Sequence, residues 1–279
     1  MVPTRPSRRS RRIAAYAALA LAYAAVMTFG GCADKLILFP TTDARPAGGA
    51  RRGWIPHAGG TIEIWTGRNG AAEPQAYVLE FFGNATRAED IASFVAGRWG
   101  DRPVEAWVPN YPGYGGSSGP AELRRIPVAA LAAYDALKQV AGDKPIVVCG
   151  NSLGTTAALY VAANRPCAGM ILQSPAPLRS LILGRFGWWN LWLLAGPVAL
   201  QVPADLDAVA NARKVRAPAL FISGDADTLI PPSYQQKVID AYAGEKRQMV
   251  LKGKGHNDAI ETLDELRSFG EALDWLSRR

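Results

Sequence analysis

The chain has 279 residues, enough for one large α/β domain or two small ones, and 49% of them are apolar. This composition is typical of a globular protein and excludes a largely disordered chain. The net charge of +7 depends on five arginines within residues 1–31; without them, 26 of the 31 basic residues face 24 acidic ones. That balance, with no cluster of basic and aromatic residues, argues against a nucleic-acid partner.

Residues 1–31 show the three parts of an export signal. An arginine-rich start is followed by the apolar stretch Ile13–Phe29 and by two glycines directly before Cys32. This arrangement resembles the lipobox of a bacterial lipoprotein, in which Cys32 would carry the lipid. The alternative is an uncleaved membrane anchor, although the apolar stretch is at the short limit of the roughly 17–25 residues that span a bilayer. In both cases we expect the rest of the chain to be exported and membrane-anchored on the periplasmic or extracellular side.

Residues 32–52 are expected to be a tether whose apolar patch, residues 36–39, packs onto the domain formed by residues 53–279. Eight segments of that domain predict strands: 54–56, 61–65, 76–82, 104–108, 146–149, 169–173, 217–223 and 248–251. Apolar residues at helical spacing predict helices between them: 87–99, 127–140, 155–164, 232–243 and 258–276. The alternation predicts a mostly parallel eight-stranded sheet with helices on both faces, made mixed by the antiparallel pair at its start.

The stretch Ile146–Gly154 reads I-V-V-C-G-N-S-L-G, a buried strand that runs into a tight turn and then a helix. In this context the pattern G-x-S-x-G indicates a nucleophile elbow at Ser152. The serine would sit in a strained turn at the top of a sheet, so the residues two before and two after it must lack clashing side chains. The alternative is a serine in an ordinary strand-to-helix turn.

A serine nucleophile needs a base and an orienting acid. The chain has two histidines, and His256 follows the last strand, at the carboxyl edge where Ser152 would lie, so we predict that it is the base. His57 is expected to be a surface or packing residue. The loop after the seventh strand holds Asp225 and Asp227. We prefer Asp227 as the acid because it lies deeper in the turn, with Asp225 capping the turn.

During acyl transfer the carbonyl oxygen of the substrate becomes negatively charged, and two backbone N–H donors are needed to stabilise it. Leu153, directly after the serine, is expected to supply one, and Asn84, in the loop after the third strand, the other. Cys149 and Cys167 are interpreted as buried structural thiols. No Cys/His spacing typical of a metal site occurs, so we expect neither a metal nor a cofactor.

These stretches together resemble the alpha/beta-hydrolase superfamily over nearly all of residues 54–276. Similarity to one branch, which includes eukaryotic depalmitoylases and membrane-associated bacterial relatives, lies in five motifs: Gly83-Asn84, Asn110-Tyr111-Pro112-Gly113-Tyr114-Gly115, Gly150–Gly154, Gly224-Asp225-Ala226-Asp227 and Gly255-His256-Asn257-Asp258. The chain departs from that branch at Phe82, where a histidine is usual. The hydrogen-bond donor expected from this loop is a backbone N–H group. The change at Phe82 therefore affects how the loop is positioned.

The combined pattern predicts a serine hydrolase that cleaves carboxylic ester or thioester bonds through an acyl-enzyme. Alternatives are a peptidase of the same fold and a catalytically idle, membrane-tethered binding protein. Residues 179–210 interrupt the alternation and predict a short apolar cap over the site, with Trp188, Trp189 and Trp192. They would line an apolar acyl pocket or face a membrane, or simply pack between helices. Tyr114 is a further candidate for the pocket or for loop packing. The expected partners are a small-molecule or lipid-like acyl substrate and a membrane.

Overall fold

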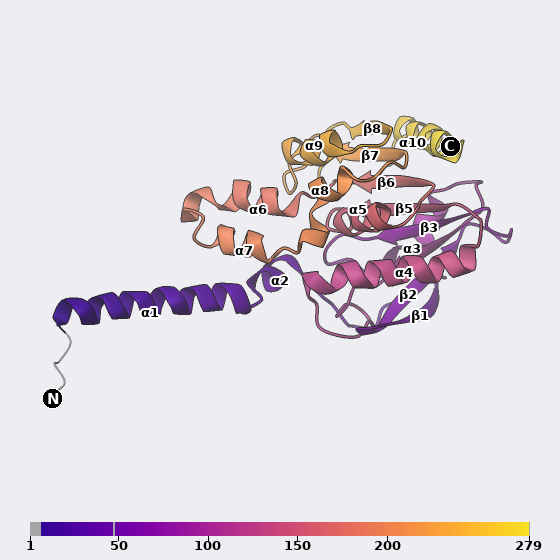
Figure 1. Cartoon of the computed structure of the whole chain (residues 1–279). Helices are drawn as coiled ribbons and strands as arrows, with labels where there is room; N and C mark the ends of the chain where they lie inside the picture. Colours follow the sequence, from indigo (N-terminus) through magenta and orange to yellow (C-terminus); the bar gives the residue numbers. More distant parts are fainter. Residues whose placement is uncertain (1–6, 47, 279) are drawn as a thin grey trace.

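The computed structural model describes residues 7–46 and 48–278, and its centre is a mixed sheet of eight strands (Figure 1). The strands lie in the order β1-β2-β4-β3-β5-β6-β7-β8. Their bounds are β1 Arg51–His57, β2 Gly60–Arg68, β3 Ala76–Phe81, β4 Val104–Pro109, β5 Ile146–Asn151, β6 Gly169–Gln173, β7 Ala219–Gly224 and β8 Lys246–Leu251. Strand β2 runs antiparallel to β1 and β4, and the other neighbours are parallel. The predicted mixed, mostly parallel sheet is confirmed.

Helices cover both faces because alternate strand residues point to opposite sides. In β5, Val147 and Cys149 pack into the core under α3 (Ala88–Gly97) and α10 (Leu263–Ser277), whereas Ile146 and Val148 pack into the other core. That second core lies under α4 (Ile126–Ala141), α5 (Gly154–Asn164), α8 (Ala208–Ala212) and α9 (Pro232–Ala241). The carboxyl ends of β3, β5, β6, β7 and β8 therefore share one edge, which we call the carboxyl edge.

The N-terminal segment forms two helices, α1 (Arg8–Phe29) and α2 (Cys32–Ile37), and α1 points away from the sheet (Figure 1). Residues 1–6 of the predicted export signal lie outside the described residues. Among the helices that the structure does describe, none combines the length and the apolar character needed to cross a membrane.

The predicted tether packs on the body only in part. Ala33 and Leu38 are buried, but Leu36 and Phe39 are exposed, so half of the expected apolar patch faces outward. Strand β1 begins at Arg51, before residue 53, where the domain was expected to start.

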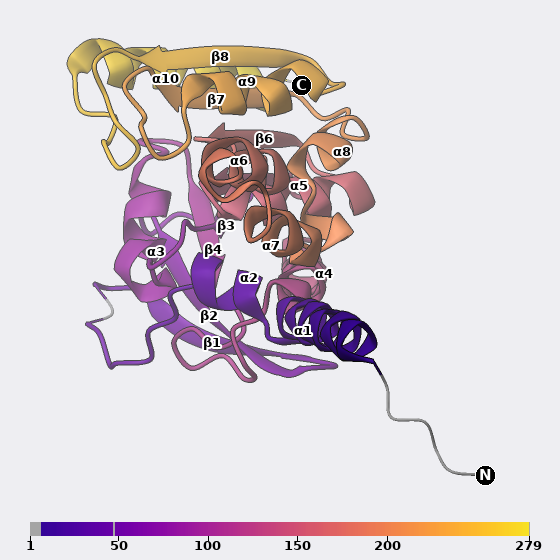
Figure 2. The ribbon, with the colours of Figure 1, turned by 90° about the vertical axis from the view of Figure 1, so that its left-hand side faces the viewer.

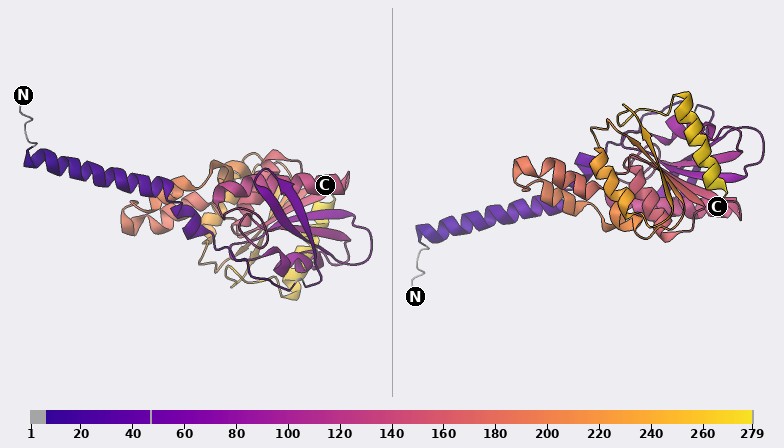
Figure 3. Two further views of the ribbon diagram at one scale, coloured as in Figure 1. Left: turned by 90° about the horizontal axis from the view of Figure 1, so that it is seen from below. Right: turned by 90° about the horizontal axis from the view of Figure 1, so that it is seen from above.

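The interruption after β6 is a helical hairpin. Helices α6 (Leu178–Phe186) and α7 (Ala195–Gln201) are joined by the short turn Trp188–Asn190 and followed by a turn at Ala204–Leu206. Both helices project away from the sheet on the side from which α1 leaves, and the views from below and above agree (Figure 3). Within the segment 179–210, for which a cap over the site was predicted, the part up to Gln201 therefore forms a projecting hairpin, whereas Leu206 and Ala208 are buried in the core of the body.

Candidate active site

Ser152 follows β5 in a turn with φ of +51°, a left-handed backbone that non-glycine residues seldom adopt. Its N–H donates to Gln173 O at 2.9 Å, which ties the turn to the end of β6. A Cβ at Gly154 would lie 2.0 Å from Phe81 O, and one at Gly150 would lie 2.7 Å from Gly154 O. The backbone contacts thus require glycine at both positions, and the turn has the geometry expected of an elbow.

A continuous row of hydrogen bonds joins three predicted site residues from three separate loops. His256 Nε2 lies 2.9 Å from Ser152 Oγ, and His256 Nδ1 lies 2.8 Å from Asp227 Oδ2. Ser152 follows β5, Asp227 follows β7 and His256 follows β8, so the carboxyl edge gathers them. This is the arrangement in which an imidazole can accept a hydroxyl proton while a carboxylate holds its other nitrogen.

Asp227 is buried but well provided with donors. Its Oδ1 accepts from the N–H groups of Leu229 and Ile230, both at 2.9 Å, and its Oδ2 accepts from Gln235 Nε2 at 3.0 Å. Burial acts to raise the pKa of Asp227, but the hydrogen bonds from His256, Ile230 and Leu229 outweigh it and leave the pKa below its usual value. The carboxyl is therefore ionised at neutral pH. Sequence reasoning missed Gln235, which lies one helical turn into the next element.

The other acid and the other histidine take structural positions. Asp225 Oδ1 accepts from Gly253 N at 2.6 Å, which joins the loops after β7 and β8, as expected for a turn-capping residue. His57 ends β1, and its Nδ1 accepts from Gly59 N at 3.2 Å. Neither lies in the hydrogen-bonded row.

The loop after β3 lies against the serine. A Cβ at Gly83 would be 3.3 Å from Ser152 Cβ. The Asn84 side chain donates to Ile37 O and accepts from Phe39 N at 3.0 Å, so the predicted tether clamps this loop. Within the described residues, the backbone N–H groups of Asn84 and Leu153 donate to no carbonyl or side chain. Neither predicted oxyanion donor is therefore committed to a hydrogen-bond partner among the described residues.

Of the two roles predicted for Tyr114, pocket lining and loop packing, the structure shows loop packing. It is fully buried, and its hydroxyl donates to Asn84 Oδ1 at 2.9 Å and accepts from Phe39 N at 3.0 Å. Burial raises its pKa to about 12. Phe82 packs against Tyr111 and Tyr114, with ring centroids 4.6 Å and 6.2 Å away, and the two tyrosine rings also contact each other. The phenylalanine that departs from the branch pattern is thus a core residue that supports the loop.

Tyr111 is a second residue that sequence reasoning left without a role. Its hydroxyl donates to Phe82 O at 2.8 Å, on the same loop that Tyr114 holds. The available signal was the stretch Asn110–Gly115, which places the two tyrosines at a fixed spacing after β4. Through this hydrogen bond Tyr111 stabilises the loop that carries Asn84.

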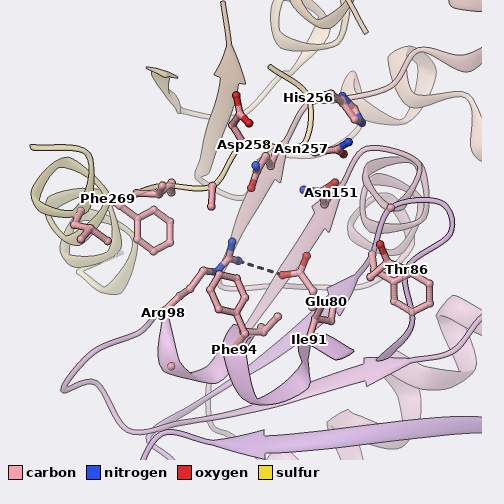
Figure 4. A pocket seen from close by; sticks show the side chains of 18 residues that line it. Glu80, Thr86, Ile91, Phe94, Arg98, Asn151, His256, Asn257, Asp258 and Phe269 are labelled. Atoms are coloured by element: carbon pink, nitrogen blue, oxygen red, sulfur yellow. Dashed lines mark hydrogen bonds and ion pairs between the residues drawn. The ribbon is translucent and has the colours of Figure 1, made fainter. Parts of the chain in front are cut away.

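A cavity of about 500 Å³ opens beside His256 (Figure 4). Asn151, Asn257 and His256 lie along one side, and its apolar walls include Phe94 and Phe269. The volume falls within the range of small-molecule sites, roughly 300–1,000 Å³. None of the predicted pocket residues lines it: Tyr114 is buried, and Trp188, Trp189 and Trp192 lie exposed at the end of the projecting hairpin.

The interior of the cavity holds one polar pair. Arg98 lies 3.5 Å from Glu80 Oε2, and Figure 4 shows the two side chains meeting inside the cavity. Burial raises the pKa of the Glu80 carboxyl to about 7, although the charge of Arg98 acts to lower it. Sequence reasoning missed both residues, because a glutamate inside a buried strand gives no sign of which partner it meets.

Cys32 begins α2 and is half-buried, whereas Cys149 is buried and Cys167 half-buried. All three lie within the described residues and are free thiols. Burial raises the pKa of Cys149 well above its usual value and that of Cys167 to about 12, so both stay protonated. Across residues 7–46 and 48–278, no group of three or more His, Cys, Asp or Glu side chains is arranged to hold a metal ion.

Sequence comparison gives the family and its relatives. Residues 82–267 match the profile of the alpha/beta hydrolase family. An uncharacterised protein of Mycobacterium tuberculosis (strain CDC 1551 / Oshkosh) is 28% identical and covers 92% of both chains. Alpha/beta hydrolase domain-containing protein 17C of Mus musculus is 28% identical over 71% of this chain; the match spans 61% of the mouse protein's length.

Structure comparison gives the same fold. An esterase of Pyrococcus furiosus superposes with a TM-score of 0.64 at 15% identity, covering 86% of this chain and 98% of its own. Est1E from Butyrivibrio proteoclasticus superposes with a TM-score of 0.64 at 17% identity, covering 83% of this chain and 100% of its own. The predicted fold class is therefore confirmed.

Proposed function

The chain belongs to the alpha/beta hydrolase family, and from this premise we propose that it is a serine hydrolase that cleaves carboxylic ester or thioester bonds of largely apolar acyl substrates. The observation that carries the proposal is the hydrogen-bonded row from Asp227 through His256 to Ser152, beside a cavity of about 500 Å³. Hydrogen bonds of this kind can activate the serine hydroxyl as a nucleophile, and an adjacent cavity can hold the group that the nucleophile attacks.

In the first step, His256 Nε2 takes the proton from Ser152 Oγ as the oxygen attacks the carbonyl carbon. The Asp227 carboxylate keeps the imidazole in the required tautomer and stabilises its protonated form. The carbonyl oxygen becomes negatively charged and accepts hydrogen bonds from the N–H groups of Leu153 and Asn84. Each such donor typically lowers the barrier by ~3 kcal/mol.

Collapse of this intermediate breaks the bond to the leaving group, and His256 donates its proton to the departing alcohol or thiol. Ser152 then carries the acyl group as an ester. Water attacks the acyl carbon while His256 takes its proton, and the second intermediate releases the carboxylic acid and restores the serine hydroxyl. Every proton is accounted for by His256, and the steps require neither a metal nor a cofactor.

The cavity supports the substrate class. Its walls include Ile91, Phe94 and Phe269, which suit an apolar acyl or alcohol chain, and it adjoins His256. The Glu80–Arg98 pair inside it offers the polar contacts that such a chain would otherwise lack. We therefore propose that the protein accepts acyl or alcohol groups that are largely apolar but carry a polar atom at the end remote from the bond that is cleaved.

The test is to react the full chain with a fluorophosphonate probe, comparing the wild type with Ser152→Ala. We expect probe labelling in the wild type only, and a loss of ester hydrolysis of roughly 10⁴-fold or more in the variant with an unchanged unfolding temperature. Labelling of the variant would refute the assignment of Ser152. A folded wild type that fails to react would favour the idle binding protein, and activity confined to peptides would favour a peptidase.

We propose that the chain is exported and held at a membrane through a lipid on Cys32. The support is the sequence pattern of residues 1–32 together with the half-exposed position of Cys32 at the start of α2. A lipid on Cys32 leaves the proposed site, which follows it in the chain, on the exported side.

A further inference from the structure

The end of the α6–α7 hairpin exposes an unusual number of large apolar side chains. Trp188, Leu191 and Leu193 are 69%, 73% and 63% exposed. We call the following exposed set the hairpin tip: Phe186, Trp188, Trp189, Leu191, Trp192, Leu193 and Leu194. The sequence has no charged residue from Phe186 to Ala204. Contiguous apolar surface of this kind marks a site of contact with another apolar phase.

Hydrogen bonds fix the conformation of the hairpin tip. Asn190 Nδ2 donates to Phe186 O at 2.9 Å, and Trp192 Nε1 donates to Leu183 O at 3.2 Å. Leu191 and Trp192 have φ of +51° and +60°, a conformation usually left to glycine or asparagine. Backbone strain of this kind costs on the order of 1–3 kcal/mol per residue and persists where it serves a function. Here it belongs to a turn that leaves both apolar side chains in solvent.

The hairpin stands next to the segment by which the chain would be anchored. The Gln201 side chain, at the end of α7, donates to Met27 O and accepts from Ala33 N at 3.1 Å. Met27 belongs to α1, and Ala33 follows Cys32. The proposed lipid on Cys32 would therefore leave the body at the base of the hairpin, and Figure 2 looks onto this side.

The catalytic residues lie on the same side. Helix α6 begins at Leu178, directly after the carboxyl end of β6, so the hairpin leaves from the edge that holds Ser152 and His256. In Figure 1 the hairpin and α1 extend from one side of the body. A surface touched by both would face the carboxyl edge of the sheet.

We propose that the hairpin tip inserts into the interfacial layer of the membrane that anchors the chain, as a second contact, and turns the carboxyl edge towards the lipid. Tryptophan with leucine and phenylalanine is the composition that partitions to this layer. Ala33, directly after the cysteine that would carry the lipid, is bonded to Gln201 at the base of the same hairpin, so the tip and the lipid reach the same membrane.

The consequence, which rests on the proposed function, is that the substrate is an acyl group carried by a membrane lipid or a membrane-bound lipidated molecule. A carboxyl edge turned towards the bilayer would receive such a chain from the surface without its passing through bulk water. The insertion itself does not depend on catalysis and is tested separately.

The first experiment uses the full chain with vesicles of phosphatidylcholine and 30% phosphatidylglycerol, made with or without brominated acyl chains, which quench nearby tryptophan fluorescence. We expect quenching in the wild type and a loss of at least half of it in the double variant Trp188→Phe, Trp189→Phe, which keeps the tip apolar. Trp54→Phe is the matched control, because Trp54 is half-exposed on β1. Equal quenching in the wild type and the double variant would overturn the proposal, as would absence of quenching in the wild type.

The second experiment uses Leu191→Asp, a residue that tolerates the left-handed backbone at this position. We expect vesicle affinity and hydrolysis of a vesicle-embedded ester to fall about tenfold, with hydrolysis of a soluble ester and fluorophosphonate labelling unchanged. Leu263→Asp, at a leucine on α10 that is even more exposed than Leu191, should change neither. Unaltered vesicle affinity, or a concentration-dependent dimer that Leu191→Asp dissociates, would overturn the proposal. If soluble activity is absent in every variant, the proposed function fails while the affinity result still stands.

Discussion

Asn84 connects the proposed oxyanion site to the rest of the fold. Its backbone N–H is a proposed oxyanion donor, and its side chain bonds to the tether at Ile37 and Phe39 and to the hydroxyl of Tyr114. Because an oxyanion donor acts only from a fixed position, the groups that hold Asn84 should affect the rate without touching the substrate. Tyr114 is therefore a positioning residue.

Replacing Tyr114 by phenylalanine tests this role. The hydroxyl bonds to Asn84 Oδ1 and to Phe39 N are lost, while the ring still packs on Phe82. We expect kcat to fall about tenfold with little change in KM, a fraction of the roughly 10²–10³ that follows loss of a whole oxyanion donor. Steady-state kinetics on a soluble ester measure both constants.

Tyr134→Phe is the matched control. This buried tyrosine loses one hydroxyl bond, to Pro166 O, where Tyr114→Phe loses two, and it lies on α4, away from the Asn84 loop. The unfolding free energy should fall by ~1 kcal/mol for each bond lost, and only Tyr114→Phe should lose kcat. Equal kinetic effects in the two variants would mean that Tyr114 contributes to stability alone.

Glu80 should give the protein a pH-dependent stability. Burial raises its pKa in the folded chain to about 7, above the ordinary value of 4.5. The folded state therefore holds this proton more tightly than the unfolded state, and the associated stability is complete below pH 4.5 and is lost as the pH rises through 7. The loss is on the order of 3 kcal/mol, since each pKa unit corresponds to about 1.4 kcal/mol.

Glu80→Gln removes the titrating group. We expect the unfolding free energy of the wild type, measured by urea denaturation, to fall relative to that of the variant between pH 4.5 and 7, and the difference to be constant above pH 8. Glu73→Gln, at an exposed glutamate in the loop before β3, should leave the pH profile unchanged. A constant difference between wild type and Glu80→Gln across this range would contradict the assigned pKa.

At the scale of elements, the strand–turn–helix unit β5–α5 holds the serine, and its glycines set how closely the unit packs. A Cβ at Gly154 would lie within 2.0 Å of Phe81 O, in the backbone of the neighbouring strand β3, which cannot move aside as a side chain would. We expect Gly154→Ala to cost about 3 kcal/mol or more of unfolding free energy and to abolish probe labelling of Ser152.

Gly270→Ala is the comparison for that prediction. Gly270 lies inside α10, and a Cβ there meets nothing within 4 Å. Alanine in a helix interior is favoured over glycine by ~0.5–1 kcal/mol, so this variant should be as stable as the wild type or more stable. A tolerated Gly154→Ala in the same denaturation series would show that the elbow relaxes more easily than its contacts indicate.

The start of α10 shows how a local cap decides an element. Apolar spacing predicted a helix from residue 258, but α10 begins at Leu263, because Thr262 and Glu265 form a reciprocal capping box. Residues 258–260 remain outside the helix and line the cavity beside His256. The capping pattern is visible in the sequence, but the apolar periodicity continues past it towards the N-terminus and predicted the earlier start.

At the scale of the whole molecule, the predicted anchor, the projecting hairpin and the carboxyl edge of the sheet all lie on one side. Cys32 lies beside Ala33, which bonds to Gln201 of α7. In the producing cell we expect the wild type to incorporate an alkyne-tagged fatty acid and Cys32→Ser to lose that label, with Cys167→Ser as the control that keeps it. A membrane-bound wild type without any label would contradict the lipidation of Cys32.

Sequence alone determined the sheet, its mixed character and the three residues of the hydrogen-bonded row. Continuous β-favouring runs, helical apolar spacing and a serine two residues from a glycine on each side are local patterns, and parallel strands always bring their carboxyl ends to one edge. The preference for Asp227 over Asp225 also rests on local sequence, because the depth of Asp227 in the turn depends on only a few neighbouring residues.

Only the tertiary structure decided which apolar and aromatic residues are inside. Tyr114, a candidate for the pocket or for loop packing, is buried, while the three tryptophans, candidates for a pocket, a membrane-facing patch or helix packing, are exposed on a projecting hairpin. Gln235, Tyr111 and the Glu80–Arg98 pair became visible through contacts between separate elements. The physical reason is that burial depends on what packs against a side chain, and those partners come from elements that only the folded chain brings together.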